Sequence, residues 1–126
     1  MILGVGLDIT EVDRIRRSLE RFGQRFTSRV LTAAEAASMP ANDAAPYVAA
    51  RFAAKEAASK ALGTGFAEGV TVKSIEVVRL PSGAPELRLH DAAKARAEAL
   101  GVTRAHLSIT HGRDVAAATV ILEGAP

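Results

Sequence analysis

The hydrophobic positions near the start of the chain change from a continuous run to a helical period. Residues 2–9 are almost all apolar, which favours a buried strand, and Gly4 and Gly6 within it permit close backbone approach. After this strand, apolar residues recur every three or four positions, as in an amphipathic helix, and Thr10 is its candidate N-cap. Because glycine weakens helices, we expect Gly23 to divide this region into two short helices.

Two more helices are predicted in the middle of the chain. Thr32 and Glu35 have the spacing of a capping box, which indicates that a helix starts there. Residues 40–46, with the sequence Pro-Ala-Asn-Asp-Ala-Ala-Pro, are predicted to form a loop. An alanine-rich helix should follow over about residues 47–62, ending at the Gly-Thr-Gly sequence of residues 63–65.

The second half of the chain has the pattern of two β-hairpins separated by a helix. The hairpins are predicted over residues 73–80 with 86–90, and over residues 105–110 with 115–122. Between them, Asp91 is the candidate cap of an amphipathic helix that stops at Gly101. This element order predicts an α+β fold in which an antiparallel sheet packs against helices, as a single domain over residues 1–126.

The composition limits how much apolar surface this domain can bury. The chain has 126 residues, of which 48% are hydrophobic, and this is enough for one core and argues against disorder. Only 4% are aromatic and tryptophan is absent, so the core must be built mainly from small aliphatic side chains. Because each of these residues buries little area, we expect the fold to gain stability by oligomerising.

Cysteine content and charge exclude several classes of protein. The absence of cysteine excludes disulfides and thiolate metal sites, and the apolar start is too short for a membrane span or a secretory signal. We therefore expect a cytoplasmic protein. A net charge of +2 does not suit a general nucleic-acid binder, yet six arginines fall between residues 14 and 29. Such a patch suits an acidic partner. Nucleic acid is the alternative ligand, which the scarcity of aromatic residues disfavours.

Three charged side chains are the best candidates for chemistry. Asp8 ends an apolar strand, where a carboxylate needs a hydrogen-bonding partner or a cation. Glu56 and Lys60 are four residues apart and share one face of the alanine-rich helix. Two carboxylates without thiolates suit a hard cation such as Mg²⁺, which completes its coordination with water and phosphate oxygens. Lys60 would then lie beside the same phosphates.

Each candidate also has a simpler interpretation. Asp8 would form a salt bridge at the strand end or interact with the N-terminus of a helix. Glu56 and Lys60 would form a solvated ion pair on the helix surface, which stabilises a helix by only about 0.2–0.5 kcal/mol. His111 follows a β-rich segment at a turn, where histidine is commonly a capping or surface residue. From the residues alone, these alternatives stay open.

Three motifs follow one another along almost the whole chain. They are Gly4-x-Gly6-x-Asp8-x-x-x-x-x-Arg14, then Arg51-Phe52-x-x-Lys55-Glu56-Ala57-x-x-Lys60-Ala61-Leu62-Gly63-Thr64-Gly65, then Ser108-Ile109-Thr110-His111. In order, spacing and total length they resemble the holo-acyl-carrier-protein synthase family, the short-chain group of 4′-phosphopantetheinyl transferases. The resemblance implies a 4′-phosphopantetheinyl transferase-like fold.

The resemblance also implies an activity and a cofactor. Family members transfer 4′-phosphopantetheine from coenzyme A to a serine of apo acyl carrier protein, releasing 3′,5′-ADP, for fatty-acid biosynthesis. By this resemblance Asp8 and Glu56 bind Mg²⁺, or Mn²⁺ in its place, and Asp8, Glu56 and Lys60 form the catalytic set. The group that takes the serine proton stays open between a carboxylate and a water on the metal.

Partners are implied in the same way. The coenzyme A-binding residues would be Arg51, Lys60, Gly63, Gly65, Thr110 and His111, and the carrier-protein-binding residues would be Arg14, Arg21 and Arg25. Neither nucleic acid nor a membrane is expected as a partner. Family members are usually homotrimers with active sites at the subunit interfaces, which agrees with the small-residue core. A structural trimer without activity is the remaining alternative, and the intact catalytic set opposes it.

Overall fold

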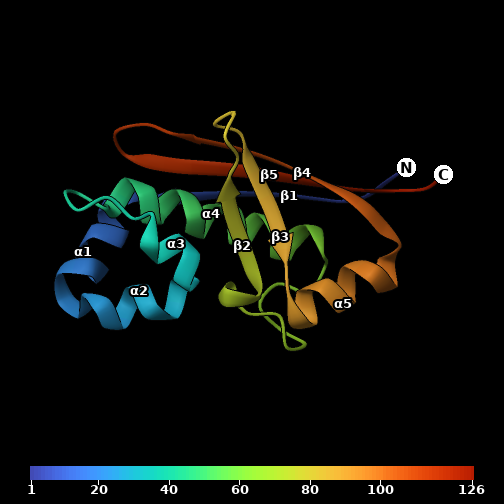
Figure 1. Ribbon diagram of the computed structural model, residues 1–126, viewed down its shortest axis with the longest axis horizontal. Helices are drawn as coiled ribbons and strands as arrows, with labels where there is room; N and C mark the ends of the chain where they lie inside the picture. Colours follow the sequence, from blue (N-terminus) through green and yellow to red (C-terminus); the bar gives the residue numbers. More distant parts are fainter.

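The computed structural model describes residues 1–126 (Figure 1). In chain order, its elements are β1 (Ile2–Glu11), α1 (Val12–Phe22), α2 (Gln24–Val30), α3 (Ala33–Ala37), α4 (Ala45–Ala61), η1 (Val72–Ser74), β2 (Ile75–Arg79), β3 (Pro85–Leu89), α5 (Asp91–Leu100), β4 (Val102–His111) and β5 (Val115–Gly124). The strands are all antiparallel to their neighbours, which confirms the predicted α+β class. None of the helices combines the length and the hydropathy that crossing a membrane requires.

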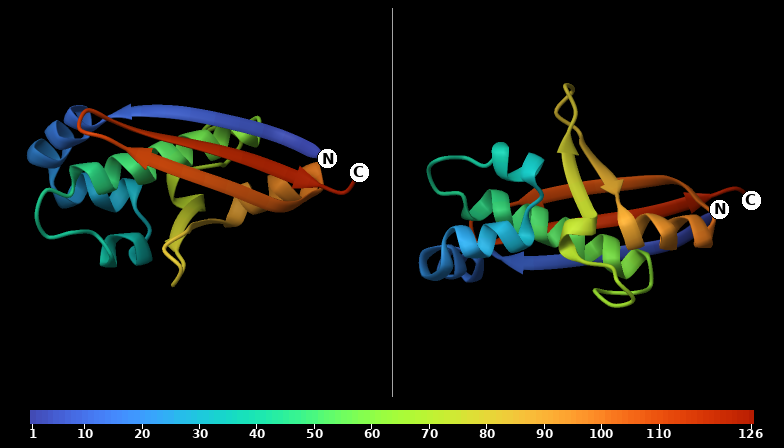
Figure 2. Two further views of the ribbon diagram at one scale, coloured as in Figure 1. Left: turned by 90° about the horizontal axis from the view of Figure 1, so that it is seen from above. Right: turned by 60° about the horizontal axis from the view of Figure 1, so that its bottom comes forward.

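A three-stranded sheet in the order β1-β5-β4 covers one side of α4 (Figure 2). β1 pairs with β5 along its whole length, ending with Glu11 opposite Val115. β4 and β5 form the predicted second hairpin, although β4 is longer at both ends than expected. The first and last strands thus lie side by side, and the amino group of Met1 donates to the carbonyl oxygen of Gly124 at 2.8 Å.

Helix α4 forms the centre of the core because its small side chains allow other elements to approach closely. Most of its alanines are buried, and Ala57 and Ala58 are fully so. A Cβ atom at Gly6 would overlap the carbonyl oxygen of Ala57, and one at Gly4 would overlap that of Ala61. The close backbone approach predicted at both glycines is therefore confirmed, and it joins β1 directly to α4.

The remaining elements pack around the other sides of α4. The predicted hairpin of β2 and β3 crosses α4 in a different direction from the main sheet (Figure 1). Helices α1, α2 and α3 gather near the start of α4, and α5 lies towards its other end (Figure 2). Gly23, with a φ of 53°, separates α1 from α2 as predicted. Thr32 and Glu35 form the predicted capping box of α3.

A buried ion pair connects α4 to α3 and to the small hairpin. Lys55 Nζ donates to Glu35 Oε1 at 2.7 Å. It also donates to the carbonyl oxygens of Val30 and Val72, at 2.7 and 2.9 Å. Glu35 Oε2 accepts from the backbone N–H of Val77 at 2.8 Å. Burial lowers the pKa of Lys55, and the Glu35 carboxylate opposes that shift. Because buried charges need partners, this network fixes how α4 packs against β2.

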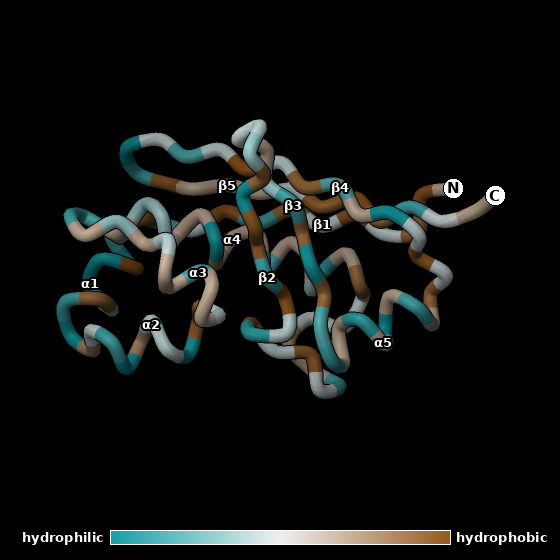
Figure 3. The backbone as a smooth tube through the Cα atoms, viewed as in Figure 1, coloured by the Kyte–Doolittle hydropathy of each residue, from teal (hydrophilic) through white to brown (hydrophobic).

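The prediction of a buried strand over residues 2–9 is wrong for one of the two faces of β1. Even-numbered positions from 4 to 10 face α4, whereas Val5, Leu7 and Ile9 on the other face are 60, 61 and 64% exposed. β1 is an edge strand, and no element of the chain covers the outer face of the sheet (Figure 2). Hydrophobic residues recur along β1 and β5 in Figure 3. An apolar surface therefore remains in contact with solvent in the single chain.

Two predicted helix caps are also wrong. Thr10 belongs to β1, and its hydroxyl donates to Asp8 Oδ2 at 3.0 Å instead of capping a helix. Glu11 occupies the N-cap position of α1 without a side-chain hydrogen bond. At α5, His90 occupies the N-cap position, and Asp91 is the first helical residue. β1 therefore continues through Thr10 to Glu11, and α5 already includes Asp91, the residue predicted to precede it.

The boundaries of two other elements differ from prediction. α4 begins at Ala45, so the last two residues of the loop predicted over 40–46 are helical. Pro46 is tolerated there because the N–H groups of a helix's first turn have no partner within the helix. The strand predicted from residue 73 begins later, at Ile75, because residues 72–74 form a 3₁₀ turn.

Candidate active site

Asp8 lies near the end of β1, on the face that packs against α4. Its Oδ1 accepts a hydrogen bond from Lys60 Nζ at 3.2 Å, and Lys60 also donates to the carbonyl oxygen of Leu7 at 3.0 Å. Its Oδ2 accepts the hydroxyl of Thr10. The Asp8 side chain is 15% exposed and that of Lys60 is 50% exposed. The carboxylate is therefore held from two sides and can still be reached from solvent.

The Glu56 side chain, on α4, lies near the Asp8 carboxylate. Burial, followed by the neighbouring Asp8 carboxylate, raises the pKa of Glu56, while the charges of Lys60 and Arg14 oppose this shift. Asp8 and Glu56 thus lie close enough for their charges to repel. The Glu56 carboxylate forms no salt bridge within the chain, because Lys60 contacts Asp8 instead. The interpretation of Glu56 and Lys60 as a surface ion pair is wrong, whereas Asp8 does form the salt bridge considered for it.

Two neighbouring carboxylates, one of them unpaired, fit a divalent cation. No group of three or more His, Cys, Asp or Glu side chains is arranged to hold a metal, so the protein would supply Asp8 and Glu56 alone. That donor set suits Mg²⁺, which binds one or two carboxylates and keeps its other positions for water and phosphate oxygens. A cation here would also relieve the repulsion between the two carboxylates.

The turn that ends α4 lies just beyond Lys60. Gly63 and Gly65 have φ values of +79° and +57°, which glycine adopts without strain. The backbone N–H groups of Thr64 and Gly65 donate to the carbonyl oxygen of Ser59, at 3.3 and 3.1 Å, and close the turn. Both predicted coenzyme A-binding glycines therefore lie at the same end of α4 as Lys60.

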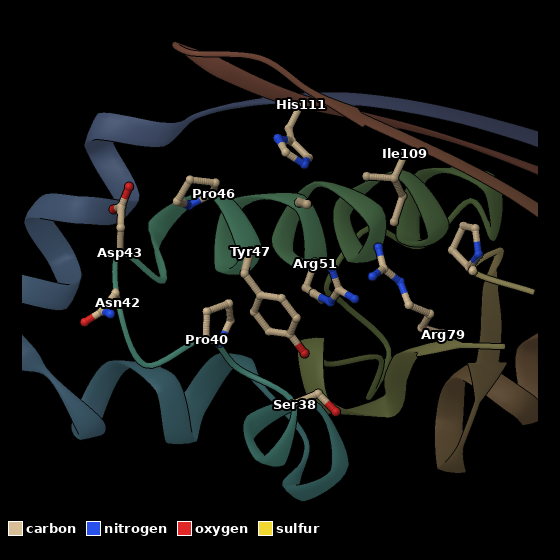
Figure 4. Close-up of a pocket in the computed structure, with 13 residues that line it drawn as sticks. Ser38, Pro40, Asn42, Asp43, Pro46, Tyr47, Arg51, Arg79, Ile109 and His111 are labelled. Carbon is tan, nitrogen blue, oxygen red and sulfur yellow. The ribbon is translucent and has the colours of Figure 1, made fainter. Parts of the chain in front are cut away.

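A cavity of about 560 Å³ lies on another side of α4 and is lined by Arg51 and His111 (Figure 4). The Arg51 guanidinium stacks on the Tyr47 ring, 3.9 Å from its centroid, and Arg51 Nε is buried without a hydrogen-bond partner. The Tyr47 hydroxyl donates to the carbonyl oxygen of Glu35 at 2.7 Å, which anchors the ring. Thr110, the neighbour of His111 on β4, is exposed and does not line the cavity.

The cavity and the carboxylate pair lie on different faces of α4. Arg51 and Glu56 are five residues apart, which corresponds to about 140° around a helix axis. Neither Asp8 nor Lys60 lines the cavity. The single chain therefore gathers the predicted coenzyme A-binding residues at two places. Lys60, Gly63 and Gly65 lie at one of them, and Arg51 and His111 lie at the other.

The three arginines predicted to bind a carrier protein are exposed on α1 and α2. Arg14 and Arg21 belong to α1 and Arg25 to α2, and none of them forms an ion pair within the chain. Arg16, by contrast, contacts two aspartates. The charge of Arg14 acts on Glu56, so this end of the arginine patch lies near the carboxylate pair.

Three supporting side chains were not among the site residues predicted from the sequence. The two-residue period of a strand places Thr10 on the same face as Asp8, a signal that the cap pattern obscures. Lys55 is a charge among buried alanines, which signals a buried partner but does not identify it. Arg79 enters the cavity from β2, and nothing in its local sequence indicates this position.

Comparison with known proteins agrees with this arrangement. The family model of the 4′-phosphopantetheinyl transferase superfamily matches residues 4–120. A holo-[acyl-carrier-protein] synthase of Maridesulfovibrio salexigens is 60% identical over 123 residues, covering 98% of this chain and 99% of that protein. The crystal structure of holo-[acyl-carrier-protein] synthase from Neisseria meningitidis has a TM-score of 0.90 at 39% identity, covering 98% of this chain and 99% of that one.

A second crystal structure is similar over the same length. It is a holo-(acyl-carrier-protein) synthase from Bacillus anthracis in complex with CoA (3′,5′-ADP), with a TM-score of 0.81, 38% identity and 99% of each chain covered. These matches extend over nearly all of the strands and helices described above, which confirms the predicted fold. The chain belongs to the holo-[acyl-carrier-protein] synthase family of the 4′-phosphopantetheinyl transferase superfamily.

Proposed function

We propose that the chain transfers the 4′-phosphopantetheine group of coenzyme A to a serine of an apo acyl carrier protein and releases 3′,5′-ADP. The observation that carries this proposal is the convergence of Asp8, Glu56 and Lys60 near the end of β1. Relatives named holo-[acyl-carrier-protein] synthase that match almost the entire chain give further support. The reaction would take place in the cytoplasm and serve fatty-acid biosynthesis.

The residues near the end of β1 are suited to a phosphoryl-transfer step. The serine hydroxyl attacks the β-phosphate of coenzyme A, a phosphorus–oxygen bond to the new product forms, and the bond to 3′,5′-ADP breaks. Negative charge builds on the phosphate oxygens, so fixed positive charges supply most of the stabilisation. Lys60 is half exposed and anchored by Asp8 and Leu7, so its ammonium can donate to the departing phosphate. The serine proton passes to a base, and the nearby carboxylates are candidates.

We also propose that Asp8 and Glu56 hold Mg²⁺, or Mn²⁺ in its place. Thr10 and Lys60 fix the orientation of Asp8, and the unpaired Glu56 carboxylate leaves its oxygens available to a cation. When bound, the ion supplies positive charge to the phosphate oxygens and helps to orient them. Both carboxylates would bind the ion in their ionised form, so each neutralises part of its charge.

Mass spectrometry of an apo carrier protein tests the function directly. Incubation with the chain, coenzyme A and Mg²⁺ should increase the carrier mass by one phosphopantetheine group. EDTA should stop this increase until Mg²⁺ or Mn²⁺ is added back. A carrier variant with alanine at the acceptor serine is the control. An unchanged carrier mass in the presence of Mg²⁺ would reject the function, whereas transfer that is insensitive to EDTA would reject only the metal.

The carrier protein would bind the arginine patch on α1 and α2. Arg14, Arg21 and Arg25 are exposed and unpaired, so they can attract an acidic protein surface without first breaking an ion pair. Arg14 also lies near Glu56, which would bring a carrier bound here close to the reacting phosphate. The patch and the carboxylate pair would thus act on the same substrate protein.

Replacing Arg21 and Arg25 together with alanine should raise the KM for the carrier protein by about tenfold or more, because two charge-assisted contacts are lost. The kcat should change little, since neither arginine contributes to the environment of Glu56. Initial rates over a range of salt concentrations should also show a weaker salt dependence. Arg104→Ala, which removes an exposed arginine from β4, is the matched control. An unchanged KM would place the carrier-binding surface elsewhere.

We propose that a second copy of the chain completes the active site within a homotrimer. The exposed apolar residues Val5, Leu7 and Ile9 offer a surface for such a contact. In addition, Arg51 and Glu56 point to different sides of α4, so one coenzyme A molecule would meet both groups by lying between two copies. The site would then combine the carboxylates of one copy with the cavity of its neighbour.

Mixed trimers test this shared site. Arg51→Ala and Glu56→Gln should each be nearly inactive alone. Co-expressed in equal amounts and purified through two different tags, they should recover about a third of the wild-type activity, because every trimer that carries both tags has one intact interface of three. Mixtures that remain as inactive as their components would show that each copy works alone. The double variant mixed with wild type is the control for subunit exchange.

A further inference from the structure

The Arg96 side chain reaches from α5 to the C-terminal end of α4. Its Nε donates to the carbonyl oxygen of Leu62, the C-cap residue of α4, at 3.0 Å. Nη2 of the same guanidinium lies 3.5 Å from the position that a Cβ atom would take at Gly63. Arg96 is half-buried and forms no ion pair within the chain. Its charge therefore lies against the end of α4 and not against an acidic side chain.

The neighbours of Arg96 on α5 give it no acidic partner. The positions three and four residues away along the helix are apolar, namely Ala92, Ala93, Ala99 and Leu100. Ala93 and Ala97 belong to the same core cluster as Leu62, so the packing of small residues holds α5 beside the end of α4. The stem of Arg96 leaves α5 at this contact, and the guanidinium binds the helix end.

The helix end that Arg96 contacts carries partial negative charge. The last four carbonyl groups of a helix have no partner within it, and the aligned peptide dipoles add up to about half a negative charge there. The turn after α4 satisfies part of this need, because the N–H of Gly63 donates to the carbonyl oxygen of Lys60 at 3.0 Å. The carbonyl oxygen of Leu62 receives its hydrogen bond from Arg96 instead.

This negative end adjoins the place where phosphates would bind. Lys60 belongs to the last turn of α4, and its ammonium contacts the Asp8 carboxylate. In the proposed function this ammonium donates to a phosphate of coenzyme A. A phosphate there would also be repelled by the carbonyl end of the helix, unless a fixed cation offsets that partial charge. Arg96 is a second cation at this end, held in place by α5.

We propose that Arg96 is a positioning residue for coenzyme A, which holds the turn of residues 62–65 against α5 and offsets the negative end of α4. This inference rests on the proposed function. Arg96 acts through the backbone of the turn and needs no contact with the substrate. Its positive charge and its hydrogen bond to Leu62 both contribute, because the first lowers the repulsion of phosphates and the second keeps the turn closed.

Three variants of α5 test this role. Arg96→Met keeps an apolar stem but removes the charge and the donor, so the KM for coenzyme A should rise by about 3- to 30-fold. The KM for the carrier protein should stay within about twofold of wild type, because the change weakens one substrate site only. Arg96→Lys should recover most of the loss, because it keeps the charge. Lys94→Met is the matched control, since it removes an exposed charge from the same helix, and it should change neither KM. Equal increases for both substrates in Arg96→Met, or no recovery with lysine, would overturn the inference.

Measurements without turnover separate this inference from the proposed function. Calorimetric titration with coenzyme A should show weaker binding to Arg96→Met than to wild type. Hydrogen exchange at the backbone N–H groups of Gly63, Thr64 and Gly65 should be faster in this variant, because these groups close the turn. If wild type transfers no phosphopantetheine but both differences appear, the function fails and the role of Arg96 remains. Equal affinities, or equal exchange rates in the turn, would overturn the inference even if the transfer activity is confirmed.

Discussion

Replacing Asp8 with asparagine is expected to lower the kcat for carrier-protein modification by at least about two orders of magnitude. Asparagine keeps the shape of the side chain and one oxygen for Thr10 or Lys60, but it removes the negative charge. A cation would then be held by Glu56 alone. Glu56→Gln should have a similar effect, because it leaves Asp8 as the only charged ligand. Rates measured at saturating Mg²⁺ and coenzyme A would give the change in kcat.

Folding of these variants must be shown separately. Circular dichroism and thermal unfolding should be close to wild type for both, because neither substitution changes side-chain volume at a buried contact. Glu98→Gln is the matched control, since it neutralises an exposed glutamate on another helix. Metal titration followed by calorimetry should show weaker Mg²⁺ binding in Asp8→Asn than in wild type. Wild-type turnover in either variant would mean that this pair of carboxylates does not hold the catalytic ion.

The resemblance to a known family predicts that Asp8 meets Glu56 and Lys60, whereas the residues alone left simpler salt bridges as alternatives. A strand end and a helix face fix where these side chains point, and the order of elements brings the strand onto the helix. The glycines of β1 contributed the remaining information, since they indicate that two backbones touch. Local pattern thus gives the position of each side chain, and the packing of β1 on α4 brings the three side chains together.

The cavity could not be predicted in the same way. Arg79 reaches it because the β2–β3 hairpin crosses α4, and the direction of that crossing is set by tertiary packing, including the buried pair of Lys55 and Glu35. The exposure of Val5, Leu7 and Ile9 could not be predicted from local patterns either. An apolar run has the same sequence whether its outer face is covered by the same chain or by another copy.

The second large effect is a loss of stability, which we expect when Gly6 is replaced by alanine. A methyl group there would overlap the backbone carbonyl of Ala57, and α4 cannot yield easily because Lys55 ties its other side to Glu35. Overpacking of a core commonly costs about 1–3 kcal/mol, and a clash with helix backbone should exceed the upper end of that range. We therefore expect Gly6→Ala to lower the free energy of unfolding by more than about 3 kcal/mol, which for this size of chain means a decrease in Tm of about 10 °C or more.

Gly112→Ala provides the matched control, because no atom lies within 4 Å of the position its Cβ would take. Its unfolding free energy should stay within about 1 kcal/mol of wild type. Gly6→Ala should also lower kcat below the melting temperature, since any shift of β1 away from α4 moves Asp8 relative to Glu56, and displacements of about 1 Å can reduce rates about 100-fold. Equal stability of the two alanine variants would mean that β1 and α4 do not touch at Gly6. A variant that is destabilised but fully active would instead separate the packing of the strand from the placement of the carboxylates.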